Sequence, residues 1–128
     1  NVSLSYNGLA MAPIRANINA ALFEWVIENL MKNSLDALQG QGEIEVTIGE
    51  DEKSVFVEVR DTGKGIAKAN WERIFEPGFT TKTRGWGLGL SLSRRIIEEY
   101  HAGKIGVVRS EIGVGTTIRV TLKKCEDD

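Results

Sequence analysis

The segment EIEVTIGEDEKSVFVEVR, residues 43–60, carries the pattern that decides the fold. Apolar and polar residues alternate from Glu43 to Ile48 and again from Ser54 to Arg60, which is the spacing of strands with one buried face. A polar turn from Gly49 to Lys53 separates the two runs. We therefore predict a β-hairpin at the centre of the sequence.

Helices are predicted on either side of this hairpin. Helical spacing runs over residues 17–38 and stops at Gly40 and Gly42. A second helix is predicted over residues 87–101, with Gly103 placed to cap its end. The apolar stripes that support the two helices comprise Phe23, Ile27, Leu30, Met31 and Leu38 in the first, and Leu88, Leu92 and Ile96 in the second.

Three further strands complete the predicted fold. Alternation indicates strands over residues 2–6, 105–109 and 116–122, the last two joined by a glycine-containing turn. A short helical piece is expected over residues 71–75, followed by an irregular segment over 76–86. Helices segregated from a mostly antiparallel sheet favour the α+β class: a two-layer sandwich whose mixed sheet is covered on one face by helices.

Composition limits the classes of function. The 128 residues fit one domain, and 16 basic against 18 acidic side chains leave a net charge of −2. Nucleic acid and anionic membrane are therefore not preferred partners. The single cysteine, Cys125, excludes an intrachain disulfide and suits a reducing cytosol.

The sequence shows no segment that would anchor it in a membrane. No apolar run approaches the roughly 20 residues that a membrane helix needs. Because the first residues already resemble a strand, we expect a piece of a longer chain, located in the cytoplasm. An inner-membrane anchor elsewhere in the full-length protein would not be visible here.

The first candidate site lies on the first helix. Asn29, Asn33 and Asp36 share one helical face, although asparagine is a mediocre helix former. Amide oxygens suit Mg²⁺, which is held by few protein groups together with phosphate oxygens. The alternative is a solvated polar face without a ligand.

The second candidate site directly follows the hairpin. In the segment Asp61–Ile66, two glycines let backbone approach a ligand closely, and Asp61 can accept a hydrogen bond from an exocyclic amine such as that of adenine. A simple turn after an edge strand is the alternative interpretation.

The third candidate site opens the second helix. The segment Gly85–Leu90 has three alternate glycines, which expose backbone N–H groups where a helix begins and favour phosphate binding. It does not match the dinucleotide-binding fingerprint, because the spacing differs and no parallel strand follows. A flexible hinge would also explain these glycines.

A polar segment with Pro and Gly, residues 75–82, precedes that helix and has the composition of a mobile lid. Lys82 could reach a phosphate as a point charge. Thr80 and Thr81 are either ligand contacts or turn hydroxyls, whereas Phe75 and Phe79 are better interpreted as hydrophobic anchors of the lid.

In this order the motifs resemble those of the GHKL ATPase superfamily. Asn29–Asn33 resembles its N box, Asp61–Ile66 its first glycine box and Gly85–Leu90 its second. Phe75–Lys82 resembles the F box, which points to histidine kinases within the superfamily. Gly113–Ile118 resembles the closing strand, where a threonine lies near the adenine pocket.

The resemblance implies the Bergerat α/β sandwich with bound ATP and Mg²⁺. Asn33 would be the main metal ligand with Asn29 nearby, and Asn33 and Lys82 would be the catalytic residues. Asp61 would recognise the adenine N6 amine. The full set implied to bind nucleotide is Asn29, Asn33, Asp36, Asp61, Gly63, Gly65, Ile66, Phe75, Thr81, Lys82, Gly85, Gly87, Leu88, Gly89, Leu90 and Thr116.

Three positions depart from the family pattern. Asp36 stands where many relatives place a basic phosphate contact, so its role is open. Ser34 replaces a small alanine. The segment Gly78–Arg84 is short, which indicates a compact lid, and Trp86 is expected either over the nucleotide or against the base of the lid.

The function implied for residues 1–128 is that of a histidine kinase catalytic domain in two-component signal transduction. It would transfer the γ-phosphoryl group of ATP to a histidine on a dimerisation domain that this sequence lacks, and would serve a response regulator indirectly. The only histidine, His101, is expected at a helix end, where a cation would suit the helix dipole. The alternatives are an anti-sigma-type protein serine kinase and a non-catalytic nucleotide-sensing module; the F-box resemblance disfavours a topoisomerase-type ATPase.

Overall fold

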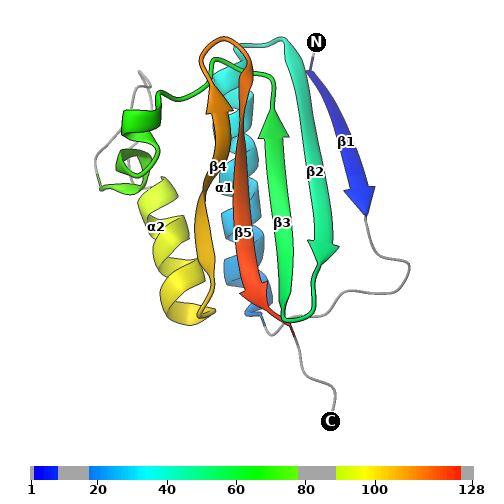
Figure 1. Ribbon diagram of the computed structural model, residues 1–128, viewed down its shortest axis with the longest axis vertical. Coiled ribbons are helices and arrows are strands. Elements are labelled where there is room, and N and C mark those ends of the chain that lie inside the picture. Colours follow the sequence, from blue (N-terminus) through cyan, green and yellow to red (C-terminus); the bar gives the residue numbers. More distant parts are fainter. Residues whose placement is uncertain (1, 9–17, 78–88, 125–128) are drawn as a thin grey trace.

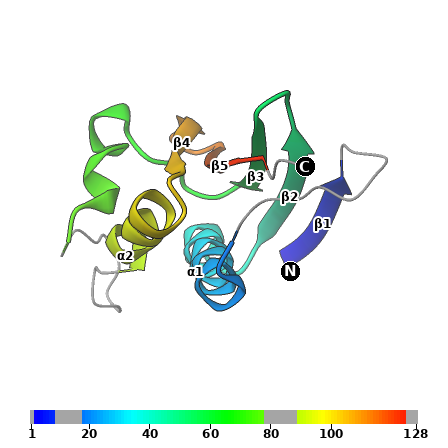
Figure 2. The same ribbon diagram turned by 90° about the horizontal axis from the view of Figure 1, so that it is seen from below.

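Five strands form one sheet, with α1 and α2 covering one of its faces (Figures 1 and 2). The structure is a computed structural model, which describes residues 18–77 and 89–124 in full and the backbone of residues 2–8. Its elements are β1 (Val2–Gly8), α1 (Ala20–Leu38), β2 (Gly42–Glu50), β3 (Ser54–Asp61), the 3₁₀ turns η1 (Lys68–Asn70) and η2 (Arg73–Phe75), α2 (Gly89–Arg95), the π-helical turn η3 (Ile96–Tyr100), β4 (Lys104–Glu111) and β5 (Gly115–Lys123).

The sheet is mixed, in the order β1-β2-β3-β5-β4. The predicted hairpin is confirmed, because β2 and β3 pair antiparallel with Val46 opposite Val59. β5 pairs antiparallel with both β3 and β4, while β1 runs parallel to β2. The predicted α+β sandwich with a mostly antiparallel sheet is therefore confirmed.

The core lies between the sheet and the helices. α1 begins after Asn19, whose side chain accepts a hydrogen bond from the Leu22 amide at 3.1 Å, and buries Val26 and Leu30 against the sheet. Burying one such side chain contributes about 1.5–3 kcal/mol, so this face decides how α1 packs. The strands contribute alternate apolar residues, among them Ile44, Val59, Ile118 and Val120.

The end of the second helix differs from the prediction. The left-handed conformation belongs to Ala102, with φ 53°, and not to Gly103. Gly103 is needed for a different reason, since a Cβ there would overlap the Thr121 carbonyl oxygen of β5. The Gly103 amide still caps the helix by donating to Ile97 O at 2.9 Å.

His101 lies at the end of the second helix, as predicted, and it is buried there. Its Nε2 accepts a hydrogen bond from the Asn19 amide at 2.9 Å, and its Nδ1 lies 3.0 Å from Ile96 O. A ring that accepts at Nε2 and donates at Nδ1 is the neutral tautomer. His101 therefore joins the start of α1 to the end of η3.

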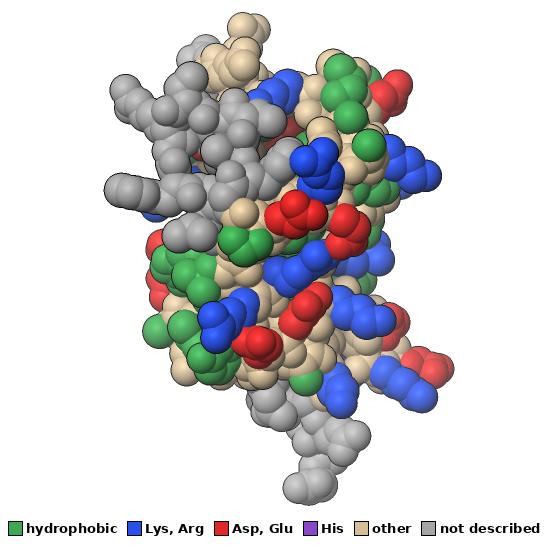
Figure 3. Space-filling model, turned by 90° about the vertical axis from the view of Figure 1, so that its left-hand side faces the viewer, with side chains coloured by type: hydrophobic (Ala, Val, Ile, Leu, Met, Phe, Trp, Pro, Cys, Tyr) green, Lys and Arg blue, Asp and Glu red, His purple; other side chains and the backbone are tan. Residues whose placement is uncertain are grey.

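Charged side chains on the exterior largely neutralise one another. On the face formed by α2 and the neighbouring turns, basic and acidic side chains are interspersed (Figure 3), with Arg94 2.8 Å from Glu72 and Arg95 2.8 Å from Glu99. The sheet face turned away from α1 has a hollow of about 300 Å³, lined by Glu45, Thr47, Glu58, Arg60, Val108, Arg109, Thr117 and Arg119. Because Arg119 lies 3.1 Å from Glu58 and Arg60 lies 3.6 Å from Glu45, four of the charges in this hollow are already paired.

Candidate functional site

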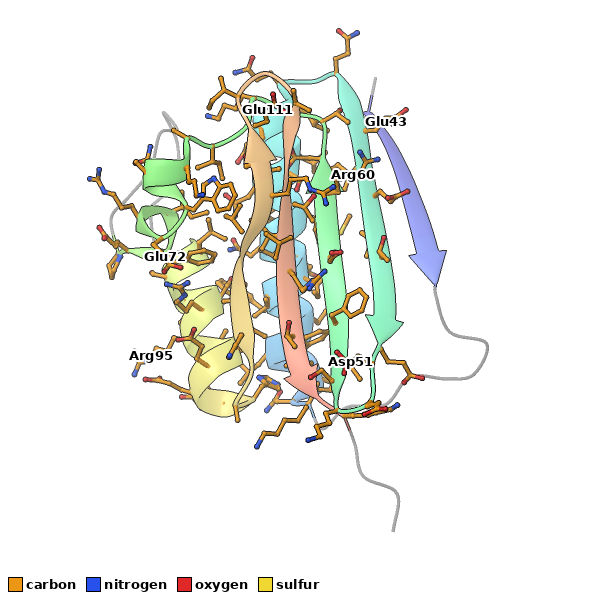
Figure 4. The ribbon with its side chains drawn as sticks, in the orientation of Figure 1. Glu43, Asp51, Arg60, Glu72, Arg95 and Glu111 are labelled. Carbon is orange, nitrogen blue, oxygen red and sulfur yellow. The ribbon has the colours of Figure 1, made fainter. Side chains whose placement is uncertain are left out.

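The loop that follows β3 is held between α1 and the β4–β5 hairpin. The Lys64 amide donates to Ala37 O of α1 at 3.1 Å, and Lys64 O accepts from the Gly113 amide at 2.8 Å. At the same end of the sheet, the Thr62 amide donates to Glu43 O at 3.1 Å. Glu43 and Glu111 mark this end in Figure 4, and Asp51 marks the opposite end.

The two glycines of this loop are required by contacts within the protein. A Cβ on Gly63 would lie 2.6 Å from Ala37 O. Gly65 has φ +80°, and a Cβ there would overlap Glu111 O. The structure shows close approach of α1 and of the hairpin to these glycines, and the close approach of a ligand stays a prediction. They shape the loop by allowing it to pack.

Asp61 ends β3 as a buried carboxylate, only 6% exposed. Its Oδ1 accepts a hydrogen bond from the Gly63 amide at 2.9 Å, and the carboxylate also accepts from Ser34 and from the backbone of Thr116. Burial is the largest influence on this group and raises its pKa, although these hydrogen bonds oppose the rise. Asp61 is thus an acceptor buried at the junction of α1, β3 and β5.

Thr116 lies beside Asp61, as the predicted adenine end of the site requires. The two residues are paired across β3 and β5, and Thr116 is 6% exposed. Ser110 connects this pair to the loop: its Oγ lies 2.8 Å from Thr116 Oγ1 and accepts from the Ile66 amide at 2.7 Å. Asp61, Ile66 and Thr116 are therefore brought together.

The predicted asparagines meet the start of α2. Asn29 is half-buried, and a Cβ on Gly89 would lie 2.6 Å from its Oδ1. Asn33, one turn further along α1, donates from Nδ2 to Asn29 O at 2.9 Å. The structure therefore brings together Asn29, Asn33 and Gly89, while Asp36 lies exposed beyond them.

Other predicted residues lie elsewhere. Leu90 is half-buried against the core. Phe75 is 4% exposed with the Arg94 guanidinium 4.1 Å from its ring centre, so it is a core anchor next to residues 76–77. Thr81, Lys82, Gly85, Gly87 and Leu88 lie outside the described residues, as do Phe79, Thr80 and Trp86.

Sequence reasoning missed three side chains that hold this arrangement. Ser93 is fully buried and bonded to Asn29, Ser110 supports Ile66, and Trp71 donates from Nε1 to Ile66 O at 3.0 Å. Isolated serines carry no spacing signal, because their importance depends on which element packs against them. Trp71 offered a weak signal, as an indole in a short polar segment usually seeks an acceptor.

The two groups of residues lie on one side of α1. Ala37 contacts the loop after β3 and Asn29 contacts Gly89, about 12 Å apart at ~1.5 Å per residue of helix. A buried acceptor at one end fits an exocyclic amine, and amide oxygens at the other fit a hard cation such as Mg²⁺. The described residues therefore include one group suited to an exocyclic amine and others suited to a hard cation.

The comparison with protein families agrees with this fold. Residues 19–126 match the family described as histidine kinase-, DNA gyrase B- and HSP90-like ATPase. The chain belongs to this family, which confirms the predicted superfamily and shows a nucleotide-binding domain of the ATPase type.

Similar curated proteins are sensor and sporulation kinases. The chain is 43% identical over 98 residues to sporulation kinase E of Bacillus subtilis (strain 168), and 42% identical over 97 residues to the sensor histidine kinase ZraS of Escherichia coli (strain K12). Each match covers 76% of this chain but only 13% and 20% of those relatives, respectively.

Solved structures share the fold. The catalytic domain of the histidine kinase ThkA has a TM-score of 0.85 and 32% identity, covering 96% of this chain and 80% of that one. Full-length ShkA in complex with AMPPNP has a TM-score of 0.85 at 22% identity, which shows the fold alone. Within its family the chain is thus of the histidine kinase type. Among the described residues, none of the helices has the length and apolar character needed to cross a bilayer.

Proposed function

We propose that residues 1–128 are the catalytic domain of a histidine kinase, which binds Mg²⁺·ATP and transfers the γ-phosphoryl group to a histidine on a separate dimerisation domain. The kinase names of the relatives support this reaction, and the chain spans a fifth or less of the two relatives named above. A crystal structure of ThkA in complex with the response regulator TrrA, 29% identical to this chain, supports an indirect response-regulator partner.

The observation that carries the proposal is that the loop holding Asp61 and the start of α2 both lie against α1, at different points along that helix. The buried Asp61 carboxylate accepts from the Gly63 amide, in a loop that is bonded to Ala37 of α1. Asn29 of the same helix contacts Gly89 of α2. One nucleotide lying along α1 would thus place its base at Asp61 and its phosphates near Gly89. Asp61 would accept from the adenine amine, and Asn33 with Asn29 would hold Mg²⁺ through amide oxygens.

The metal would supply neutralisation of the phosphate charge that develops during transfer. The chain's own residues would then hold the base and orient the phosphates. Phosphoryl transfer needs little else from a protein besides this positioning and the neutralisation of charge. Lys82 is proposed to contact the γ-phosphate as a point charge.

The position of His101 supports an acceptor on another domain. It lies about 18 Å along the second helix from Gly89, at ~1.5 Å per residue. It is buried, and both ring nitrogens are already engaged, with Asn19 and with Ile96. We therefore expect the isolated domain to bind ATP without phosphorylating itself.

A transfer assay tests the reaction. The chain is incubated with labelled ATP and Mg²⁺, alone and with a supplied histidine-bearing helical-hairpin domain. We expect label on the hairpin domain and almost none on the chain alone. Substantial label on His101 would overturn the proposal. Label on a serine of an added protein would favour the anti-sigma-type kinase, and ATP binding with no transfer would favour a sensing module.

Calorimetric titration tests the metal assignment. ATP is titrated with and without Mg²⁺ into wild type and Asn33→Ala, with Gln41→Ala as a control that truncates an exposed amide. We expect Asn33→Ala to lose about tenfold or more of the Mg²⁺-dependent affinity and to keep the metal-free affinity, because it removes one amide oxygen. Unchanged binding under both conditions would reject Asn33 as a ligand.

Nucleotide selectivity tests the base assignment. Asp61→Asn replaces one acceptor oxygen by a donor, so it should weaken ATP about tenfold to a hundredfold. GTP lacks the adenine amine and should be affected much less. Equal weakening of ATP and GTP would count against Asp61 as the reader of the base.

A further inference from the structure

Ser93 lies on α2, one turn after Gly89, and none of it is exposed. Its hydroxyl donates to Gly89 O at 2.8 Å and accepts from Asn29 Nδ2 at 3.1 Å. A fully buried hydroxyl thus connects the two helices at the point where Asn29 meets Gly89. Neither the sequence motifs nor the proposed roles above use this residue.

The two bonds at Ser93 determine which way the Asn29 amide faces. A serine hydroxyl has a single hydrogen, and here that hydrogen serves Gly89 O. Ser93 can then only accept from Asn29, so Asn29 must present its nitrogen and turn its oxygen away. If the amide were flipped, the hydroxyl would donate to the Asn29 oxygen and lose its bond to Gly89 O. The observed orientation keeps two bonds and the flipped one keeps one.

The oxygen of Asn29 is consequently the end of the amide that does not bond to Ser93. Both ends of the amide lie close to Gly89, since a Cβ there would be 2.6 Å from Asn29 Oδ1 and 2.8 Å from Nδ2, so the bond to Ser93 decides which of the two atoms is presented to a ligand. The backbone oxygen of Asn29 in turn accepts from Asn33 Nδ2 at 2.9 Å. Hydrogen bonds therefore link Gly89 to Ser93, Ser93 to the Asn29 side chain, and the Asn29 backbone to Asn33.

We propose that Ser93 is a positioning residue that fixes the Asn29 amide with its oxygen toward the cation. The inference rests on the proposed function, because it concerns the same Mg²⁺ site. Ser93 touches neither metal nor base in this account. It acts through Asn29, and without it the amide can present its NH₂ group to the cation, which repels a metal.

The test is a double-mutant cycle on metal binding. A non-hydrolysable ATP analogue is titrated at several Mg²⁺ concentrations into wild type, Ser93→Ala, Asn29→Ala and the double variant. We expect Ser93→Ala to weaken the Mg²⁺-dependent affinity about tenfold, the value of one hydrogen bond, and to spare the metal-free affinity. On the Asn29→Ala background, Ser93→Ala should have no further effect on Mg²⁺ dependence.

Two additional measurements separate positioning from folding. Ser54→Ala removes a hydroxyl at the opposite end of the sheet and should leave Mg²⁺ dependence unchanged. In metal-free protein, the NMR signals of the Asn29 side-chain amide, assigned by their loss in Asn29→Ala, should show slow hydrogen exchange that Ser93→Ala abolishes. This second readout requires neither ligand nor activity.

The outcomes are distinguishable. If Asn29→Ala weakens Mg²⁺-dependent binding but Ser93→Ala does not, this inference fails and the proposed function stands. If Ser93→Ala has the same effect with and without the Asn29 side chain, Ser93 does not act through Asn29 and the inference is overturned. If Asn29→Ala leaves Mg²⁺ dependence unchanged, Asn29 is not a metal ligand, and both that assignment and the inference are wrong.

Discussion

The loop after β3 and the contact between α1 and α2 both depend on glycine, but for different reasons. A Cβ on Gly65 would meet the backbone of Glu111, which cannot move without opening the β4–β5 hairpin. A Cβ on Gly89 would meet the end of one side chain, that of Asn29. The loop after β3, where the base is proposed to bind, is the base end of the site, and its shape is fixed by the fold. The contact between Asn29 and Gly89, where the phosphates are proposed to bind, is the phosphate end, and it depends on a side chain that can shift.

The largest expected effect is that of Gly65→Ala. Alanine is strained at φ +80°, and its methyl group would overlap Glu111 O, so we expect a loss of about 3 kcal/mol or more in the free energy of unfolding. Urea denaturation measures this loss. Gly106→Ala is the matched control, since nothing lies within 4 Å of its Cβ position, and it should be neutral or slightly stabilising.

Gly89→Ala should leave the fold intact and impair the site. Alanine suits a helix better than glycine, and the Asn29 side chain can move aside, so stability should change by no more than about 1 kcal/mol. The displaced Asn29 oxygen should weaken Mg²⁺-dependent nucleotide binding about tenfold, as measured by titration. A loss of stability as large as that of Gly65→Ala would refute the distinction between the two ends.

The strands, helices and candidate residues that depend on local spacing could be predicted from the sequence, whereas contacts between elements could not. The strands, both helices and the pairing of β2 with β3 follow from local spacing, because residues such as Val46 and Val59 must point toward a core. The grouping of Asn29 with Asn33 follows from helical geometry alone. The kind of ligand that suits each candidate residue followed from its chemistry, whereas the assembly of these ligands into one Mg²⁺·ATP came from the resemblance to a family.

Contacts between elements could not be predicted in the same way. Ser93 and Ser110 matter because of what packs opposite them, which no period within a helix or strand reveals. Ala102 takes the left-handed conformation in place of Gly103, and Gly103 is required instead because Thr121 of a distant strand leaves no space for a Cβ at residue 103. His101 is neutral and buried because the start of α1 supplies an N–H donor. Each of these facts depends on tertiary packing.

The smallest expected effect concerns the charge of Asp61 and the stability of the base end. Burial raises the pKa of Asp61 above its ordinary value of 3.8, so the folded protein binds this proton more tightly than the unfolded chain. Between 3.8 and the raised value, stability therefore falls as pH increases. Below 3.8 the group is protonated in both states, and the cost of burying its charge is absent.

Comparing the free energy of unfolding of wild type with that of Asp61→Asn across this pH range isolates the cost of burying the Asp61 charge. Asp51 and Glu72 have lowered pKa values and oppose the trend, but both variants contain them, so they cancel in the difference. Urea denaturation of both proteins, from below pH 3.8 to neutrality, should show wild type losing stability relative to Asp61→Asn as pH rises. A relative gain would mean that the hydrogen bonds from Gly63, Ser34 and Thr116 outweigh desolvation. In that case the carboxylate would belong to the fold as fully as Gly65 does, and not be held there at a cost for the sake of a ligand.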